Sequence, residues 1–379
     1  MKYRVHFPKQ PKDKHALRFM TWNALAPSLL QKNKHLYTNC RPDATRKETR
    51  LPRIIDKVKE INPDVLAMQE VENITEWLSP AMHSLGFEGV FKQRIGNDTT
   101  DGIAIFVRSS RLQISATEEI EYKSLSVSPP LAHYIVEGGA SRSGGEEGGK
   151  SLEATAARRK LCLDLHKPTV ALLLTLKDIA TGKELLVGCT HILFNPNRGL
   201  VKLSQVDAFF SAATRAARRG QQPHSAGASL VEPSIVLMGD FNCSPKSILY
   251  KYMNGRAVRE PIIAECTWDG SRRRVPSRKS NVIIDAPRHA LAERLRSAYA
   301  KVGEPACTSF SGPSPLTVDY IWYERDRFQV AALLPTPNRA QMFAYNSLPH
   351  EDMPSDHVPL ACDLQFLNSS GIARVGTDI

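Results

Sequence analysis

An acid and an amide lie two residues apart in the segment Met238–Asn242, directly after the apolar run Ile235–Leu237. A run this short between two prolines predicts a buried strand. Side chains two residues apart on an extended chain point the same way, so Asp240 and Asn242 should emerge together at the strand's end. The carboxylate can take a proton from water or bind a hard cation, and the amide can donate to a phosphate oxygen. The same pair can also form nothing more than an Asx turn.

Five other places in the chain put a polar residue beside an apolar run in the same manner. The residues concerned are Asn23, Glu70, His191, Asp319, and the neighbours Asp356 and His357. A single polar residue at a strand end usually caps or solvates the chain. Repetition of this pattern with Asn, Glu, Asp and His indicates one shared site.

The elements that must position these residues alternate between strand-like and helical patterns, which predicts an α/β fold. Apolar residues recur at helical spacing from Thr45 to Ile61, where Pro63 ends the helix, and from Leu200 to Ala217. Continuous apolar runs such as Leu172–Leu176 predict strands.

The chain of 379 residues is interpreted as a single domain over residues 18–367. Residues 1–17 form an N-terminal extension and residues 368–379 a C-terminal tail in this interpretation. The segment 137–159 is rich in Gly, Ser, Glu and Ala, and we expect a flexible insertion there.

The formal net charge of +11 favours a polyanionic partner, although a generally basic surface would give the same value. Five cations lie within residues 272–279, which predicts nonspecific RNA affinity or simply a solvated loop. Seven cysteines without a C-x-x-C pair predict reduced thiols. The sequence shows no signal sequence and no membrane-spanning run, so we expect the protein in the cytoplasm, with the nucleus and the mitochondrion as alternatives.

Several longer motifs lie along the chain, at Thr21–Ala26, Gln69–Val71, Asp101–Phe106, His191–Gln205 and Ser355–Leu360. These motifs resemble the endonuclease/exonuclease/phosphatase superfamily, and within it the deadenylase-related branch that includes nocturnin and the Angel proteins. The resemblance runs from about Arg18 to about Phe366. The Asn-Pro-x-Arg-Gly and Lys-Leu-x-Gln segments look most like Angel.

The resemblance implies a DNase-I-like αβ sandwich of two sheets and a divalent-metal phosphoesterase. Glu70 is the expected metal ligand, assisted by Asn23 and by Asp356 at a second position or through water. Magnesium fits hard oxygen ligands and manganese can replace it, whereas zinc would call for a Cys/His cluster that the sequence does not offer.

Four residues have expected roles in the chemistry itself. Asp240 would activate the attacking water and Asn242 would donate to the phosphoryl oxygen. His357 would bind the scissile phosphate, with Asp319 fixing its tautomer. We expect Asp319 and His357 at the C-terminal ends of strands. The alternative for Asp319 is a strand-edge carboxylate paired with a surface arginine.

The loop after His191 brings further donors toward a phosphate. Asn195, Arg198 and Lys202 are the expected substrate-binding residues, and their clustering gives His191 a catalytic role. The alternative for His191 is a hydrogen-bonded core histidine.

The leading functional prediction is a phosphoesterase acting on RNA 3′ ends, as an Angel-like 2′,3′-cyclic phosphatase or in 3′-end processing. A deadenylase-type 3′–5′ exoribonuclease or a nocturnin-like nucleotide phosphatase is the alternative with the same geometry. A non-catalytic RNA-binding or scaffold protein, meeting RNA-decay or translation factors, is the alternative of another class. Lipid or inositol phosphatase action is disfavoured. Without leucine-rich docking repeats, stable membership of a deadenylase complex is not expected.

Overall fold

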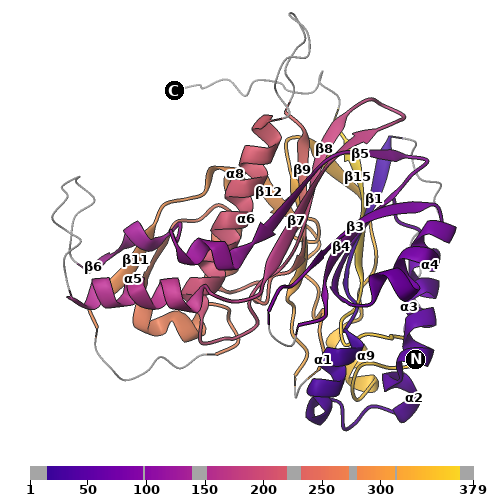
Figure 1. Ribbon diagram of the computed structural model, residues 1–379, viewed down its shortest axis with the longest axis horizontal. Helices are drawn as coiled ribbons and strands as arrows, with labels where there is room; N and C mark the ends of the chain where they lie inside the picture. The colour runs from indigo at the N-terminus through magenta and orange to yellow at the C-terminus, as the bar shows by residue number, and fades with distance from the viewer. Residues whose placement is uncertain are drawn as a thin grey trace, which may run out of the picture.

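The fold is a sandwich of two facing β-sheets with helices on both outer sides (Figure 1). It is seen in a computed structural model that describes residues 15–96, 99–138, 152–219, 232–272, 280–311 and 314–367. The expected C-terminal tail and most of the expected N-terminal extension lie outside these ranges.

The first sheet has six strands in the order β14-β15-β1-β2-β4-β3. β1 lies between β2, to which it is parallel, and β15, to which it is antiparallel. The strands are β1 (Ala16–Asn23), β2 (Val65–Val71), β3 (Phe87–Gln93), β4 (Gly102–Arg108), β14 (Phe328–Leu333) and β15 (Leu360–Phe366).

The second sheet also has six strands, in the order β12-β13-β9-β8-β7-β5. β8 and β9 are parallel, and β13 pairs with β9 in the antiparallel sense. The strands are β5 (Leu112–Glu121), β7 (Val170–Asp178), β8 (Glu184–His191), β9 (Ser234–Asp240), β12 (Leu295–Ser297) and β13 (Asp319–Glu324).

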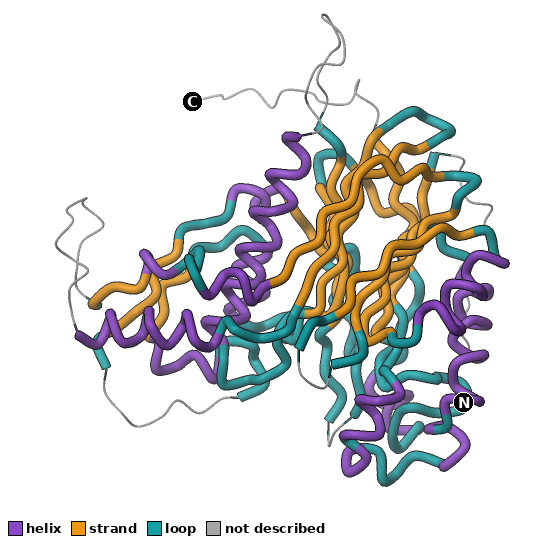
Figure 2. The backbone as a smooth tube through the Cα atoms, in the orientation of Figure 1, coloured by secondary structure: helices purple, strands orange, loops and turns teal. Residues whose placement is uncertain are grey.

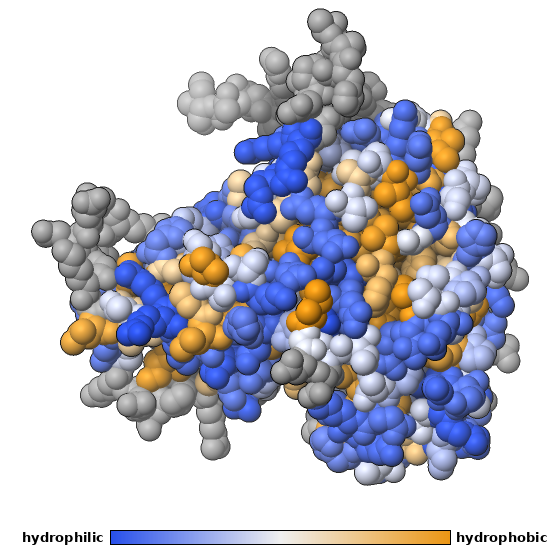
Figure 3. Space-filling model, in the orientation of Figure 1, coloured by the Kyte–Doolittle hydropathy of each residue, from blue (hydrophilic) through white to orange (hydrophobic). Residues whose placement is uncertain are grey.

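Apolar side chains from both sheets form one core between them, with members such as Leu17, Val65, Leu172, Val236 and Leu360. β1 and β9 are buried along their whole length. Burial of β9 explains its continuous apolar run, whereas β1 also buries the polar residues Arg18 and Thr21. Figure 3 shows apolar side chains gathered along the seam between the sheets on a face that is otherwise largely hydrophilic.

Helices cover the outer faces of both sheets (Figure 2). α3 (Lys47–Ile61), the π-helix η2 (Ile74–Leu78) and α4 (Ser79–Ser84) pack on the first sheet. α6 (Gly199–Arg219) packs on the second sheet. Both long helices were predicted to within two residues, and α3 ends before Pro63, at the left-handed Asn62.

A smaller lobe lies beside the second sheet and holds a three-stranded sheet of order β10-β11-β6 (Figure 1). Its elements are β6 (Ile135–Glu137), α5 (Leu152–Asp164), β10 (Val258–Pro261), the 3-10 helix η5 (Ile262–Thr267) and β11 (Val282–Ala286).

The remaining helices are short and shape the loops around the sheets. They are α1 (Pro27–Lys32), α2 (Pro42–Thr45), α7 (Ile248–Met253), α8 (Ala290–Arg294), α9 (Arg339–Ala344), and the 3-10 helices η1 (Lys34–Leu36), η3 (Tyr122–Ser126) and η4 (Ala132–Tyr134). In the described ranges, none of the helices has the length and apolarity to cross a membrane.

The flexible insertion expected over residues 137–159 needs correction at its ends. Glu137 belongs to β6, and residues 152–159 belong to α5, while residues 139–151 lie outside the described ranges. α5 packs on the core through the buried Ala154 and Leu161 and the partly buried Ala157. So sparse an apolar face leaves no helical periodicity for sequence reasoning to detect.

Candidate active site

The polar residues singled out in the sequence meet at one edge of the sandwich, the edge from which α1 and α6 start. Asn23, His191 and Asp240 are the last residues of β1, β8 and β9, and Glu70 is next to the end of β2. The structure therefore confirms that Asn23, Glu70, Asp240, Asn242 and His357 share one end of the two sheets.

Asp319 and His357 also lie at this edge, but at positions that differ from those predicted. Asp319 is the first residue of β13, and His357 lies in the turn ahead of β15, so neither occupies a C-terminal strand end. Both strands run antiparallel to β9 and β1, which brings their starts to the edge where β9 and β1 finish.

Asp240 occupies the centre of the site and is almost completely buried. Its Oδ1 accepts from the backbone N–H of Asn242 at 2.9 Å, and its Oδ2 accepts from Asn23 Nδ2 at 3.3 Å. Gly239 precedes it with φ +144°, and a Cβ there would lie 2.0 Å from the Thr190 carbonyl oxygen, so only glycine fits. Burial and the Asp319 carboxylate raise the pKa of Asp240 to about 7, where a general base works well at neutral pH.

Asn242 has a left-handed backbone, with φ +44°. Its Nδ2 donates to the Ile192 carbonyl oxygen at 3.0 Å, so one amide hydrogen already holds the β8 loop. An amide nitrogen carries two hydrogens, and the second can serve a phosphoryl oxygen.

His357 and Asp319 form a buried ion pair, with His357 Nδ1 2.8 Å from Asp319 Oδ2. Burial opposes a charge on His357, but Asp319, Asp356 and Asp240 outweigh it and raise the pKa of His357 well above the usual range. The ring is therefore an imidazolium at neutral pH. Its Nε2 lies 3.9 Å from Asp240 Oδ2 and points its proton into the site. The surface-arginine alternative for Asp319 is excluded.

His191 faces Asp240 from the other side, with its Nε2 3.5 Å from Asp240 Oδ2. Burial, the Arg94 guanidinium and the charge on His357 lower the pKa of His191 well below the usual range. The site thus holds two histidines in opposite states, one charged and one neutral.

The carboxylate of Glu70 anchors an acidic cluster beside Asp240. Glu70 is the extra residue where the β2–β4 register shifts between Gln69 and Val71, and its φ is +53°. This bulge turns the side chain toward Asn23, whose Nδ2 donates to Glu70 Oε1 at 2.9 Å. Burial and the carboxylates of Asp356 and Asp101 raise the pKa of Glu70 to about 7.

A hard divalent cation fits this acidic cluster. The carboxylates of Asp356 and Asp101 repel that of Glu70, although Asp101 pairs with Arg94 and Asp356 accepts from Tyr37, and the Asn23 amide donates to Glu70. A cation would remove the repulsion, and oxygen donors are what Mg²⁺ and Mn²⁺ prefer. Asp240, Asp319 and His357, beside this cluster, bring ligand atoms within 4.8 Å of one another.

Sequence reasoning missed several residues that hold the site in place. Tyr37 donates to Asp356 Oδ2 at 2.9 Å. Arg50, fully buried in α3, donates to the carbonyls of Leu25 and Pro354, each two residues away in the chain from Asn23 or Asp356. Thr308 Oγ1 accepts from the backbone N–H of Asp319, while its carbonyl accepts from Val358 N. No spacing rule in the sequence links such distant segments.

The predicted substrate-binding residues do not form one patch. Asn195 is exposed and its Oδ1 closes a turn by accepting from Asn197 N at 2.9 Å. Arg198 is partly exposed, with its Nε 3.4 Å from Asp164 Oδ2. Arg272 of the basic segment donates to Asn197 Oδ1 at 2.6 Å, whereas residues 273–279 lie outside the described ranges.

Lys202 does not face substrate. It is fully buried in α6, and its Nζ donates to Asp269 Oδ2 at 2.7 Å and to the Asn242 carbonyl oxygen at 2.9 Å. Its role is to support the backbone of Asn242. From sequence alone, a lysine in the first turns of a helix is expected to be exposed. The buried partner of Lys202, Asp269, is far away in the sequence, so no local pattern predicts the pair.

We expect Lys202→Met to lower the free energy of unfolding by about 3 kcal/mol, because Asp269 would stay buried without its cation. Denaturant titration measures the change. Lys59→Met is the matched control, since Lys59 forms an exposed pair with Asp56 on α3 and should cost less than about 1 kcal/mol. Equal losses in the two variants would contradict a structural role for Lys202.

Asp319→Asn should lower turnover by roughly one to several powers of ten with little change in the melting temperature. An amide cannot stabilise the imidazolium of His357, so the ring loses its charge. Steady-state kinetics beside a thermal melt test this, with the exposed Asp326→Asn as control. Full activity in Asp319→Asn would show that Asp319 has no part in turnover.

The two facing sheets and the acid, amide and histidine residues at their common edge define an α/β sandwich of the DNase-I-like class. A sequence model of the Endonuclease/Exonuclease/phosphatase family matches residues 20–357. The chain belongs to this family, as its motifs predicted.

Known proteins similar to the chain bear out the expected branch. 2′,5′-phosphodiesterase 12 of Bos taurus is 25% identical over 96% of this chain and 54% of its own length, so the chain spans about half of that protein. Protein angel homolog 2 of Bos taurus is 25% identical over 90% of this chain and 68% of its own length. A crystal structure of ANGEL2, a 2′,3′-cyclic phosphatase, in complex with adenosine-2′,3′-vanadate is 23% identical, with a TM-score of 0.73 over 97% of this chain and 99% of that chain.

Proposed function

We propose that the protein is a magnesium-dependent phosphoesterase that acts on RNA 3′ ends. The observation that carries the proposal is the convergence on one point of a base, Asp240, a charged histidine, His357, a neutral histidine, His191, and an acidic cluster around Glu70. Hydrolysis of a phosphate ester needs these parts together: a base for water, cationic stabilisation of the phosphoryl oxygens, and donors around them.

The residues of the site have complementary parts in the hydrolysis. Asp240 accepts a proton from the attacking water, whose oxygen bonds to phosphorus as the ester P–O bond breaks. The His357 imidazolium stabilises the charge on a nonbridging oxygen, and Asp319 keeps that ring protonated. His191 and the remaining amide hydrogen of Asn242 donate to the phosphoryl group. Each such donor typically contributes about a hundredfold to a thousandfold in rate.

Asn23 connects the base to the acidic cluster, because its amide donates to both Asp240 and Glu70. Glu70, Asn23 and Asp356 would hold the cation. When bound, a divalent cation polarises the phosphoryl oxygen and offsets the charge that develops on the leaving oxygen.

RNA is the substrate class that the surroundings favour. A small apolar pocket opens beside Asn242, and Phe194, which is 73% exposed, and Pro196 line it. An exposed aromatic ring beside the phosphate site suits an unpaired base. The relatives point the same way, since one is named a 2′,5′-phosphodiesterase and another is described as a 2′,3′-cyclic phosphatase.

The proposal commits to 2′,3′-cyclic phosphate ends or related 3′-end processing, with 3′–5′ exonuclease action as the second chemistry. Purified protein should be given matched RNAs ending in a 2′,3′-cyclic phosphate, in 3′-hydroxyl poly(A), in a 3′-hydroxyl mixed sequence, and in 2′,5′-linked adenosines, with magnesium and with chelator. We expect magnesium-dependent opening of the cyclic ester. Shortening of the 3′-hydroxyl RNAs instead would support an exonuclease, and binding of RNA without hydrolysis would support a scaffold.

A further inference from the structure

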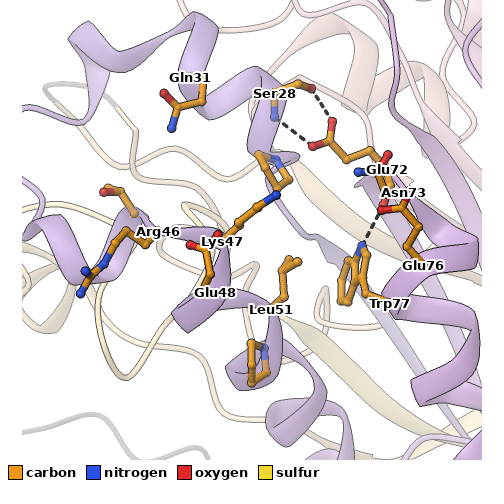
Figure 4. A pocket seen from close by; sticks show the side chains of 13 residues that line it. Ser28, Gln31, Arg46, Lys47, Glu48, Leu51, Glu72, Asn73, Glu76 and Trp77 are labelled. Atoms are coloured by element: carbon orange, nitrogen blue, oxygen red, sulfur yellow. Dashed lines mark hydrogen bonds between the residues drawn. The ribbon is translucent and has the colours of Figure 1, made fainter.

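A second, larger pocket of about 710 Å³ opens on the first-sheet side of the site, between α1, the start of α3 and η2 (Figure 4). Its size falls within the roughly 300–1,000 Å³ usual for small-ligand sites. None of the residues given a part in hydrolysis lines it. Among its lining residues are Gln31, Lys47, Leu51, Glu72 and Trp77.

Glu72, which lines the pocket, is close in the chain to the acidic cluster. Glu72 follows Glu70 by two residues in the chain and is nearly buried. Its carboxylate accepts from Ser28 N and Oγ and from Thr100 Oγ1, which precedes Asp101. These contacts join α1 to the segments beside β2 and β4, so the pocket adjoins the chain segments that carry Glu70 and Asp101.

The pocket presents a fixed aromatic ring and a free cation. Trp77 Nε1 donates to the Glu72 carbonyl oxygen at 2.8 Å, which holds the indole along the wall, next to Leu51 (Figure 4). Lys47 extends its amine into the pocket, and among the described residues its Nζ has no hydrogen-bond or ion-pair partner. Gln31 is exposed and adds an amide.

The pocket also holds Arg46, which is paired with Asp43, and a second amide, Asn73. A planar apolar face, an unpaired cation and side-chain amides suit a single nucleotide of unpaired RNA: stacking for the base, charge for the phosphate, and hydrogen bonds for a base edge. The exposed Glu48 and Glu76 also line the pocket. Their charge disfavours a longer phosphate track, which limits the pocket to one nucleotide.

We propose that this pocket binds the penultimate nucleotide of the RNA, with its base on Trp77 and its phosphate beside Lys47. The proposal rests on the proposed function and extends it, because the Phe194 pocket lies on the second-sheet side and would take the terminal nucleotide. Two successive nucleotides would then hold the RNA 3′ end in the site.

Tryptophan fluorescence tests the binding directly. The chain has four tryptophans, and Trp22, Trp268 and Trp322 are fully buried, so Trp77 is the one that a ligand can reach. Single-stranded RNA added in the presence of chelator should quench the fluorescence. Lys47→Ala should weaken the binding roughly tenfold, whereas Lys59→Ala on the same helix should leave it unchanged. Quenching that is absent, or equal in Trp77→Phe and the native protein, would overturn the proposal.

Kinetics on substrates of increasing length separate this proposal from the proposed function. A mononucleotide, a dinucleotide and a longer oligonucleotide with the same terminus should show a falling KM in the native protein. Trp77→Ala should raise KM for the longer substrates roughly tenfold and leave the mononucleotide unchanged, and Trp77→Phe should recover most of the loss. Equal KM values in Trp77→Ala and the native protein would overturn the pocket assignment alone. No hydrolysis of any substrate by the native protein would overturn the proposed function, while RNA quenching would still support the pocket.

Discussion

Asp240→Asn should lower the rate of the chemical step by about three to four powers of ten. An amide of the same shape cannot accept the proton of the attacking water. The local structure should survive, because an amide oxygen can still accept from the Asn242 N–H that now bonds to Asp240 Oδ1. Single-turnover rates at saturating enzyme measure the step without product release.

A magnesium titration of the same variant separates two roles for Asp240. If Asp240 is the base, the magnesium midpoint of Asp240→Asn should match that of the native protein. A large shift of the midpoint would instead make Asp240 a metal ligand. A rate loss below about tenfold would show that another residue is the general base. His191, 3.5 Å from Asp240, would be the first residue to test.

Glu70→Gln should lower activity at low magnesium by about a hundredfold or more, with partial recovery at high magnesium. The variant keeps the hydrogen-bond acceptor for Asn23 but loses the charge that attracts the cation. Calorimetric titration with manganese reports the metal affinity independently of turnover. Glu88→Gln, at an exposed position of β3 in the same sheet, is the matched control. Native turnover by Glu70→Gln at low magnesium would show that Glu70 is no ligand.

The same variant should be more stable than the native protein when chelator keeps the metal away. The folded-state pKa of Glu70 is raised to about 7 by burial and by the neighbouring carboxylates. The native protein therefore loses stability as pH rises from the unfolded pKa of about 4.3 through 7, since the charge becomes costly only in the folded state. Glutamine has no such charge, so the stability gain should be present at pH 8 and absent at pH 4.

The sequence predicted the long elements and the catalytic set because both depend on local patterns. α3 and α6 carry apolar residues at helical spacing, and the strand-end position of Asn23, His191 and Asp240 follows from where the apolar runs stop. Parallel neighbours such as β1 with β2 and β8 with β9 then bring those ends to one edge.

What the sequence could not predict depends on contacts between distant segments. The bulge that turns Glu70 into the site arises from its pairing with β4, which no local pattern encodes. The burial of Lys202 depends on its ion pair with Asp269, and the buried position of Arg50 depends on its hydrogen bond to the Pro354 carbonyl. The sequence alone does not distinguish an exposed basic residue from a buried one, because the difference depends on neighbours that are distant in the chain.

The position of β1 between β2 and β15 has a consequence for biosynthesis. β1 stays without one of its two neighbours until β15 has emerged from the ribosome. His357 and Asp356 are translated just before β15, so Asp240 and the acidic cluster gain these partners only after the rest of the two sheets has been made. A nascent or prematurely terminated chain would therefore be inert toward the RNA around it, and hydrolytic activity would report completed folding.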